Sequence, residues 1–388
     1  MIDSTCLPCL SSNSQMVFWD CLEKLFLLKG SISERVGLSA SRDQIGLKPE
    51  INREKIMKRF RFIGVFLVTA SLILGVCSVN AETVTMNIGW ETPLDSHYGI
   101  LAKKFKELVE QYSNGTIEVK LRCCGQIATE DNAFKAMQLG TVDGYFVSQN
   151  NVSPHFPLMD VFVLPYIFQS QEHVMKVTTG PVGEEIRELL LKDTGVYLLT
   201  FGGADYRDLY NTQKPIEKFE DFAGLKYRVP KNEVMIETFR AFGAEPVPLA
   251  WSETPTALET GTIDGGDNGT NVIEEMKFYE FAKYLTILEH FGGVAPLFAS
   301  ERFMNKLNDE QKAAVWKAAE EAGAFQAEFK AKATEEIRQR LVKEHGMEIT
   351  YPDKQAFIEA AKEVQVMFAD KKGPVFKEFV EKINAAAQ

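Results

Sequence analysis

The segment Ala136-Met-Gln-Leu-Gly-Thr-Val-Asp-Gly144 recurs 121 residues later as Ala257-Leu-Glu-Thr-Gly-Thr-Ile-Asp-Gly265. Each copy is typical of a helix that ends near a glycine and turns tightly into a new strand. A strand candidate precedes each copy, at residues 117–121 and 245–249. Such a turn can also arise without duplication, but the matched order of strand, helix and strand favours two related α/β lobes. Two lobes imply a cleft between them, where small ligands commonly bind.

The sequence before the first copy extends this pattern. Residues 84–90 alternate and are rich in β-formers, so they predict a strand. Asp95 or Ser96 is suited to cap the following helix, in which apolar residues recur from Leu101 to Tyr112 at helical spacing. Residues 116–121 predict a second strand. A strand, helix and strand in this order favour a sheet with parallel strands.

The C-terminal third has a different character. Asn308 is a suitable N-cap for a long helix that we expect to reach about Lys343. A short strand at 347–351 and helices at 354–370 and 373–386 follow. The predicted fold is α/β and two-lobed, each lobe a mixed sheet flanked by helices, with long C-terminal helices. We assign residues 82–206 plus 296–335 to lobe I, and 207–295 plus 336–388 to lobe II and the C-terminal helices.

The N-terminal region predicts export. A basic stretch at 57–61 precedes sixteen uncharged residues, 62–77, and the small residues of Val79-Asn80-Ala81 follow. This is the layout of a cleaved signal peptide, here 57–81, and the apolar run is short for the alternative, an uncleaved membrane anchor. Residues 1–56 stand before this signal, so we interpret them as a non-native N-terminal extension, with translation starting at Met57.

Charge and cysteine content narrow the classes of partner. The chain has a net charge of -11, and residues 82–388 alone carry -14, because residues 1–81 contain 10 basic and 7 acidic residues. Such acidity argues against a nucleic-acid partner.

After export only the adjacent Cys123 and Cys124 would remain, and adjacent cysteines pair only in a strained ring. The exported protein is therefore expected to depend on its core for stability.

A search for catalytic and metal motifs finds none. The five histidines are scattered without His-x-x-x-His spacing, and there is no nucleophile elbow. Gly265-Gly-Asp-Asn-Gly269 lacks the Lys-Ser/Thr of a phosphate loop. We therefore expect no enzyme activity, no metal and no cofactor, although a catalytic triad can also be assembled from residues far apart in sequence.

Two arginines indicate recognition of an anion. Arg228 lies within a predicted strand, Gly224-Leu-Lys-Tyr-Arg-Val-Pro230, and burial of its charge requires a partner. If it faces the cleft, its planar guanidinium can bind a carboxylate through two parallel hydrogen bonds. The alternative is a structural ion pair with an Asp or Glu. That alternative is stronger for Arg207, which has acidic neighbours in Asp205-Tyr-Arg-Asp-Leu-Tyr210.

Several stretches, taken in order, resemble the DctP-type solute receptors of TRAP transporters (tripartite ATP-independent periplasmic transporters). They are Leu164-Pro-Tyr-Ile-Phe168, Asp205-Tyr-Arg207, the strand with Arg228, Phe242-Gly-Ala-Glu-Pro-Val-Pro-Leu249, Trp251-Ser-Glu253 and the second repeat copy. The resemblance covers essentially all of residues 82–388. It implies a two-lobed, class II-like periplasmic binding protein that closes on an organic acid and delivers it to membrane permease subunits.

The resemblance also implies site residues. Arg228 matches the carboxylate-binding arginine of the family, Arg207 a second arginine at the ligand, and Asn268 an asparagine in a loop that departs from the family pattern at Gly266, Asp267 and Gly269. Its approximate register places further positions where lobe I strands meet the cleft: Trp90, Glu91, Ser148, Gln149 and Asn151. From the residues themselves, Trp251 suits either an apolar ligand face or the core. Asp267, with Glu91, Glu253 and Glu289, suits either sugar hydroxyls or a cation.

The implied protein is a monomeric periplasmic receptor. Its ligand would be a sugar acid or a dicarboxylate, and the surplus of acidic residues favours the sugar acid. Two other functions remain open, a periplasmic ligand sensor and an enzyme on the same two-lobed scaffold. A catalytic pair within hydrogen-bond reach in the cleft would distinguish the enzyme.

Overall fold

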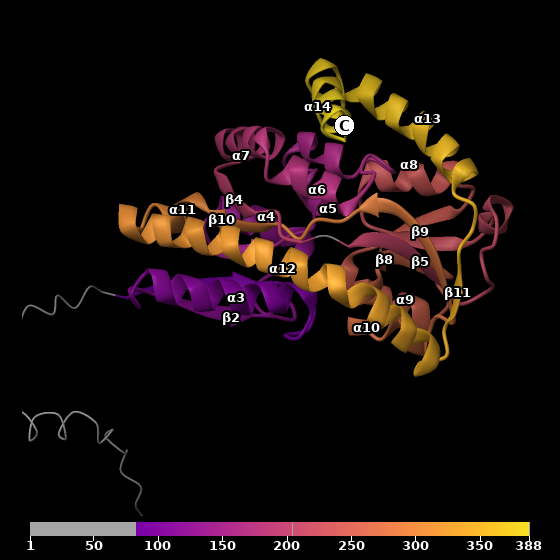
Figure 1. Ribbon diagram of the computed structural model, residues 1–388, viewed down its shortest axis with the longest axis horizontal. Coiled ribbons are helices and arrows are strands. Elements are labelled where there is room, and N and C mark those ends of the chain that lie inside the picture. The colour runs from indigo at the N-terminus through magenta and orange to yellow at the C-terminus, as the bar shows by residue number, and fades with distance from the viewer. Residues whose placement is uncertain (1–82, 204, 388) are drawn as a thin grey trace, which may run out of the picture. The chain divides into compact units, whose positions relative to one another are not determined.

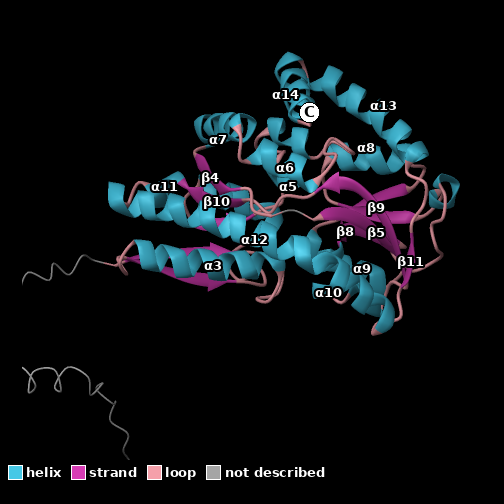
Figure 2. Cartoon of the chain, in the orientation of Figure 1, coloured by secondary structure: helices cyan, strands magenta, loops and turns pink. Residues whose placement is uncertain are grey.

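The computed structural model describes residues 83–203 and 205–387 (Figure 1). The predicted signal peptide, 57–81, and the extension, 1–56, lie outside these residues. The described residues form a pair of separate sheets, and helices flank both of them (Figure 2). None of the described helices combines the length and apolar character needed to cross a bilayer.

The first sheet has the strand order β2-β1-β3-β10-β4. β1 is parallel to β2 and β3, whereas β10 is antiparallel to β3 and β4. Its strands are β1 (Val84–Gly89), β2 (Ile117–Arg122), β3 (Gly144–Phe146), β4 (Val196–Thr200) and β10 (Leu297–Ser300). The accompanying helices are α3 (His97–Tyr112), α4 (Glu130–Gln138), α5 (Gln149–Val152), the 3-10 helix η1 (Pro157–Phe162), α6 (Gln171–Thr178), α7 (Pro181–Thr194) and α11 (Glu301–Met304).

The second sheet has the order β11-β9-β5-β8-β6-β7. β6 is parallel to β7 and β8, and β5 is antiparallel to β8 and β9. Its strands are β5 (Tyr206–Asn211), β6 (Lys226–Val229), β7 (Glu245–Pro248), β8 (Gly265–Gly269), β9 (Tyr284–Gly292) and β11 (Glu348–Thr350). The accompanying helices are η2 (Phe219–Phe222), α8 (Glu233–Ala241), η3 (Trp251–Glu253), α9 (Thr254–Glu259), α10 (Thr270–Glu275) and η4 (Phe278–Glu280).

The predicted duplication is confirmed at the level of topology. The order β1-α3-β2-α4-β3 repeats as β6-α8-β7-α9-β8, and the first strand of each series lies between the other two. After α4 and α9 the chain turns at Gly140 (φ +67°) and Gly261 (φ +68°). Both glycines adopt the left-handed conformation that other residues rarely take. The repeated sequence therefore encodes one turn, used once in each lobe.

The chain crosses between the sheets from β4 to β5 and again from β9 to β10. A third connection is α12 (Asp309–Lys343), whose 35 residues span roughly 50 Å. It contacts α3 of the first lobe and α10 of the second (Figure 1). The predicted N-cap is confirmed, because the Gln311 amide donates to Asn308 Oδ1 over 2.9 Å.

The C-terminal helices pack over both lobes. α13 (Gln355–Lys372) contacts α8 of the second lobe, and α14 (Pro374–Ala386) contacts α6 and α7 of the first. Their aromatic residues join a buried core that continues from Phe162 of lobe I to Phe239 of lobe II. The C-terminal helices thereby join the cores of the two lobes. Cys123 and Cys124 are free thiols.

Candidate functional site

A cleft opens between the two sheets, at the strand ends that the duplication brings face to face. It encloses about 470 Å³, open solvent at its mouth included. A second compartment of about 400 Å³ adjoins it and shares Arg207 and Asn268 with it. Residues after β1 and β3, the start of α3, and the ends of β6 and β8 all contribute to its walls. A ligand in this space would touch both lobes.

Arg228 is an unpaired cation in the wall of the cleft. Its side chain leaves β6 and is 4% exposed. Nε and Nη2 donate to the Leu249 carbonyl oxygen over 3.1 and 2.8 Å, and the guanidinium lies 5.5 Å from the centre of the Trp251 ring. Within residues 83–203 and 205–387, no carboxylate forms an ion pair with it. Burial lowers its pKa, since nothing close by compensates the charge in full.

Arg207, in contrast, already has a carboxylate partner. Its Nε lies 2.6 Å from Asp267 Oδ2, and its Nη2 lies 3.0 Å from Asp267 Oδ1 and 2.6 Å from the Asp267 carbonyl oxygen. Burial alone would raise the pKa of Asp267, but Arg207 and His290 hold it well below its usual range. The two arginines therefore differ in charge balance: Arg207 is neutralised within the protein and Arg228 is not.

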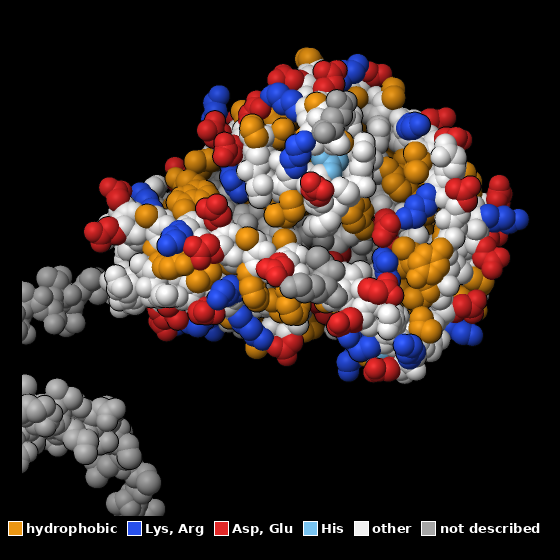
Figure 3. Space-filling view, viewed as in Figure 1, with side chains coloured by type: hydrophobic (Ala, Val, Ile, Leu, Met, Phe, Trp, Pro, Cys, Tyr) orange, Lys and Arg blue, Asp and Glu red, His pale blue; other side chains and the backbone are white. Residues whose placement is uncertain are grey.

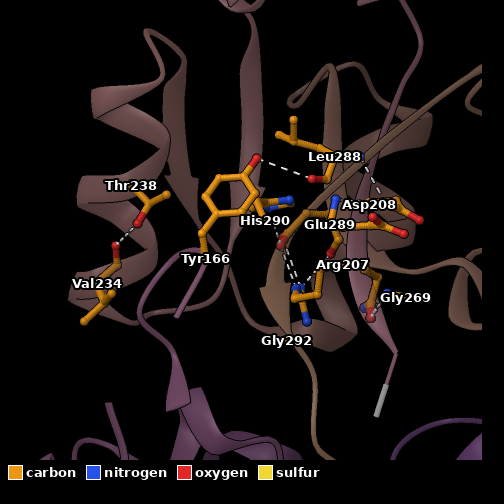
Figure 4. Close-up of polar contacts among 12 residues, drawn as sticks. Tyr166, Arg207, Asp208, Val234, Thr238, Gly269, Leu288, Glu289, His290 and Gly292 are labelled. Atoms are coloured by element: carbon orange, nitrogen blue, oxygen red, sulfur yellow. Dashed lines mark hydrogen bonds and ion pairs between the residues drawn. The ribbon is translucent and has the colours of Figure 1, made fainter. Parts of the chain in front are cut away.

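Next to Arg207, Asp208 of β5 is hydrogen-bonded to a bulged segment of β9. The β5–β9 register shifts between Arg207 and Leu209, so Asp208 faces the bulged segment. Asp208 Oδ1 accepts hydrogen bonds from the Leu288 and Glu289 amides, and its Oδ2 accepts from Thr270 and Arg338. Figure 4 shows Asp208 and Arg207 on β5 beside this segment of β9, with the Tyr166 hydroxyl of lobe I donating to the Leu288 carbonyl.

The lobe I wall opposite Arg228 is acidic. Glu130, at the start of α4, accepts hydrogen bonds on Oε1 from the Ser148 amide and hydroxyl, and its own amide donates to Glu91 Oε2 over 2.9 Å. Burial raises the pKa of Glu91 to about 7, and the charges of Glu130 and Asp131 add to this effect. A carboxyl and a carboxylate therefore line one side of the cleft, where they can accept hydroxyl hydrogen bonds.

Most of the predicted site residues come together around this space. The main cleft is lined by Arg228, Arg207, Asn268, Glu91, Ser148, Asn151 and Trp251. Gln149 lines the adjoining compartment. Trp90 is fully buried behind the wall, donating to the Pro93 carbonyl over 3.2 Å and packing on Phe146. Asp267 lies buried beneath Arg207.

Several residues that line the cleft were not predicted from the sequence: Thr92, His97, Tyr98, Glu130, Asn150, Pro230 and Val272. Two of them had a usable signal. Glu130 begins the helix that leads into the first repeat, and His97 begins the helix capped by Ser96. Helix starts next to strand ends face the cleft in both lobes, so polar residues there were candidates.

The lobes also touch at the mouth of the cleft. The His97 amide donates to Glu275 Oε1 over 2.8 Å, and His97 Nδ1 lies 2.8 Å from Glu275 Oε2. Lys231 of lobe II lies 3.2 Å from Asp131 of lobe I. The described arrangement is therefore one in which the lobes have closed toward each other.

The described residues contain no cluster of three or more His, Cys, Asp or Glu side chains placed to hold a metal ion. On the face in Figure 3, acidic and basic side chains are interspersed. The described part of this face has no region of a single charge, so the charge of the cleft is set by the individual side chains that line it.

Among the described residues, the cleft of this two-lobed α/β protein is polar and one of its two arginines has no ion-pair partner, an arrangement suited to binding a small anionic solute. Residues 88–372 match the family model for bacterial extracellular solute-binding protein, family 7 (DctP), and the chain belongs to this family. Members of this family are solute-binding proteins rather than enzymes.

Named relatives and solved structures agree with this assignment. The 2,3-diketo-L-gulonate-binding periplasmic protein YiaO of Escherichia coli is 29% identical over 77% of this chain and 92% of its own length. A TRAP periplasmic solute-binding protein from Haemophilus influenzae with bound L-gulonate superposes with a TM-score of 0.74, at 28% identity over 78% of this chain and 100% of that chain. One from Xanthobacter autotrophicus with bound β-D-galacturonate has a TM-score of 0.73, at 26% identity over 77% and 99%.

Proposed function

We propose that this protein is a periplasmic receptor that binds a sugar acid with a single carboxylate and delivers it to TRAP permease subunits. The observation that carries the proposal is the contrast between the two arginines. Arg207 is neutralised by Asp267, so of these two arginines Arg228 is the one left to pair with a ligand carboxylate. The bound or named ligands of the three similar proteins are also six-carbon sugar acids with one carboxylate.

The remaining polar groups suit the hydroxyls of such a ligand. Glu91 and Ser148 line the lobe I side, and Asn151 and Asn268 add amide donors and acceptors. Trp251, which is 9% exposed, presents one side to the Arg228 guanidinium and lines the cleft. We propose that the carboxylate binds Arg228 and that the hydroxylated carbons extend toward Glu91 and Asn268.

A thermal-shift experiment tests this assignment. D-Galacturonate or L-gulonate, added at a concentration well above its dissociation constant, is expected to raise the melting temperature, because a ligand that binds only the folded state stabilises it by mass action. Succinate, which brings a second negative charge into a cleft with one unpaired cation, is expected to give a much smaller shift, and neutral D-galactose none. A larger shift with succinate than with every sugar acid would contradict the proposed ligand class.

Export belongs to the same proposal. We expect the receptor to leave the cytoplasm on the signal peptide at 57–81, to be cleaved after Ala81 and to act as a monomer. N-terminal sequencing of the exported protein is expected to begin near Glu82. A mature terminus near Met1 would exclude both the cleavage and a start at Met57.

A further inference from the structure

The closed cleft contains more negative than positive charge once an anion has entered. Arg228 and Arg207 face three carboxyl groups, those of Glu91, Glu130 and Asp267. His97 does not change this balance, because its partner is Glu275. A ligand carboxylate on Arg228 would bring the balance to two cations against four acids. An excess of negative charge is unfavourable in a closed cleft of low dielectric. Protonation of one acid is the simplest way to reduce it.

Hydrogen bonding singles out Glu91 as the acid that takes the proton. Asp267 is held by the Arg207 guanidinium through both of its oxygens. Glu130 accepts two hydrogen bonds from Ser148. The Glu91 carboxyl accepts only the Glu130 amide among the described residues, and no basic side chain of the described chain forms an ion pair with it.

The acidic groups around Glu91 favour its protonated form, and Arg228 opposes them. The groups facing it are Glu130 and Asp131 of α4, the Tyr145 hydroxyl of β3 and Arg228 of β6. Asp131 is paired with Lys231, and the Tyr145 hydroxyl donates to the Ala128 carbonyl. Two groups in this set favour the ionised form of Glu91: the Glu130 amide, which donates to it, and Arg228. Of the two, Arg228 is the group that a ligand carboxylate would occupy.

We propose that binding of the sugar acid is coupled to uptake of one proton by Glu91, whose protonated carboxyl then donates a hydrogen bond to the ligand. This inference rests on the proposed function, since it needs an anion on Arg228. In the closed arrangement without ligand the pKa of Glu91 is already about 7, so the carboxyl is half protonated at neutral pH. An anion on Arg228 raises this pKa further. The affinity of the receptor therefore falls as the pH rises above 7.

Calorimetry with D-galacturonate in buffers of different ionisation enthalpy measures the proton directly. We expect an uptake of about 0.5 proton at pH 7 and about 0.9 at pH 8, and a dissociation constant that rises about fivefold between these values. Glu91→Gln carries a permanently neutral amide. This variant is expected to bind with no buffer dependence and with the same affinity at pH 7 and pH 8.

Glu130→Gln is the matched variant, since it removes the neighbouring acid. It is expected to retain proton uptake by Glu91 but to shift the pH dependence of that uptake to lower pH, because the charge of Glu130 contributes to the raised pKa of Glu91. Binding without proton uptake at pH 8 would overturn the proton linkage, and uptake that persists in Glu91→Gln would overturn its assignment to Glu91; both outcomes leave the proposed function intact. Absence of binding heat with D-galacturonate, L-gulonate and every other sugar acid would overturn the proposed function and this linkage together.

Discussion

Replacement of Arg228 by alanine is expected to weaken sugar-acid binding at least about 30-fold. The side chain is buried, and no carboxylate of the described residues pairs with it. Truncating one partner of a buried, hydrogen-bonded charge pair costs about 2–5 kcal/mol, and each 1.4 kcal/mol is about tenfold in affinity. The loss is measured by calorimetry with D-galacturonate.

Arg228→Lys tests geometry as well as charge. Lysine keeps the positive charge but loses the planar fork, together with the two hydrogen bonds to the Leu249 carbonyl that orient it. We expect affinity to fall about tenfold or more. Arg240→Ala is the control, because Arg240 is exposed and pairs only with Glu237 on the same helix. Near-normal affinity in either Arg228 variant would exclude it as the carboxylate anchor.

Replacement of Asp267 by asparagine is expected to lower the free energy of unfolding by about 3 kcal/mol. Asp267 is fully buried, and its loss leaves the Arg207 guanidinium without its counter-charge. Breaking a buried pair by removing one partner commonly costs about 3–5 kcal/mol. Urea unfolding followed by fluorescence measures the change. Asp95→Asn, at an exposed pair with Lys103, is the matched control and should unfold like the unmodified protein.

The contribution of the Arg207–Asp267 ion pair to folding stability is expected to fall as the pH is lowered. The pKa of Asp267 is depressed in the folded state, so its stabilising contribution is present above the ordinary pKa of 3.8 and is lost as the pH falls through the folded value. The unmodified protein should therefore lose more stability on acidification below about pH 4 than Asp267→Asn does. Parallel acid-unfolding curves for the two proteins would show that the ion pair is not formed.

A double variant separates the two possible roles of Arg207. Replacing a buried ion pair by apolar residues of similar size is often close to neutral in stability. Arg207→Met combined with Asp267→Leu should therefore recover most of the stability that Asp267→Asn loses. If Arg207 also contacts the ligand, the recovered protein will still bind D-galacturonate weakly. Normal binding by the double variant would show that the Arg207–Asp267 pair stabilises the fold and does not contact the ligand.

Local patterns predicted most of the fold. The period of apolar residues predicted α3, and the Asn308 cap correctly marked the start of the long helix α12. The duplicated Gly-Thr-x-Asp-Gly turn predicted two lobes of like topology, which the matching strand orders confirm. These features depend on residues close together in the chain. Side-chain period, capping and left-handed glycines are properties that a short segment specifies by itself.

Charge pairing could not be predicted in this way. Asp205 and Asp208 flank Arg207 in sequence, yet the acid that forms the bidentate pair with it is Asp267, some sixty residues away. Asp208 instead holds the β9 bulge. The pairing of β5 with β8 brings Arg207 and Asp267 onto neighbouring strands, and sheet register of this kind is a non-local property.

The sequence alone established an acidic protein with two duplicated lobes and two arginines suited to an anion. It left open which arginine was free. The tertiary structure separated the two, because antiparallel pairing of β5 with β8 placed Asp267 against Arg207, while Arg228, on β6, contacts a carbonyl oxygen and an indole ring and has no acidic partner among the described residues. A buried guanidinium must find its counter-charge in the protein or in a ligand, and only the folded chain decides which of the two supplies it.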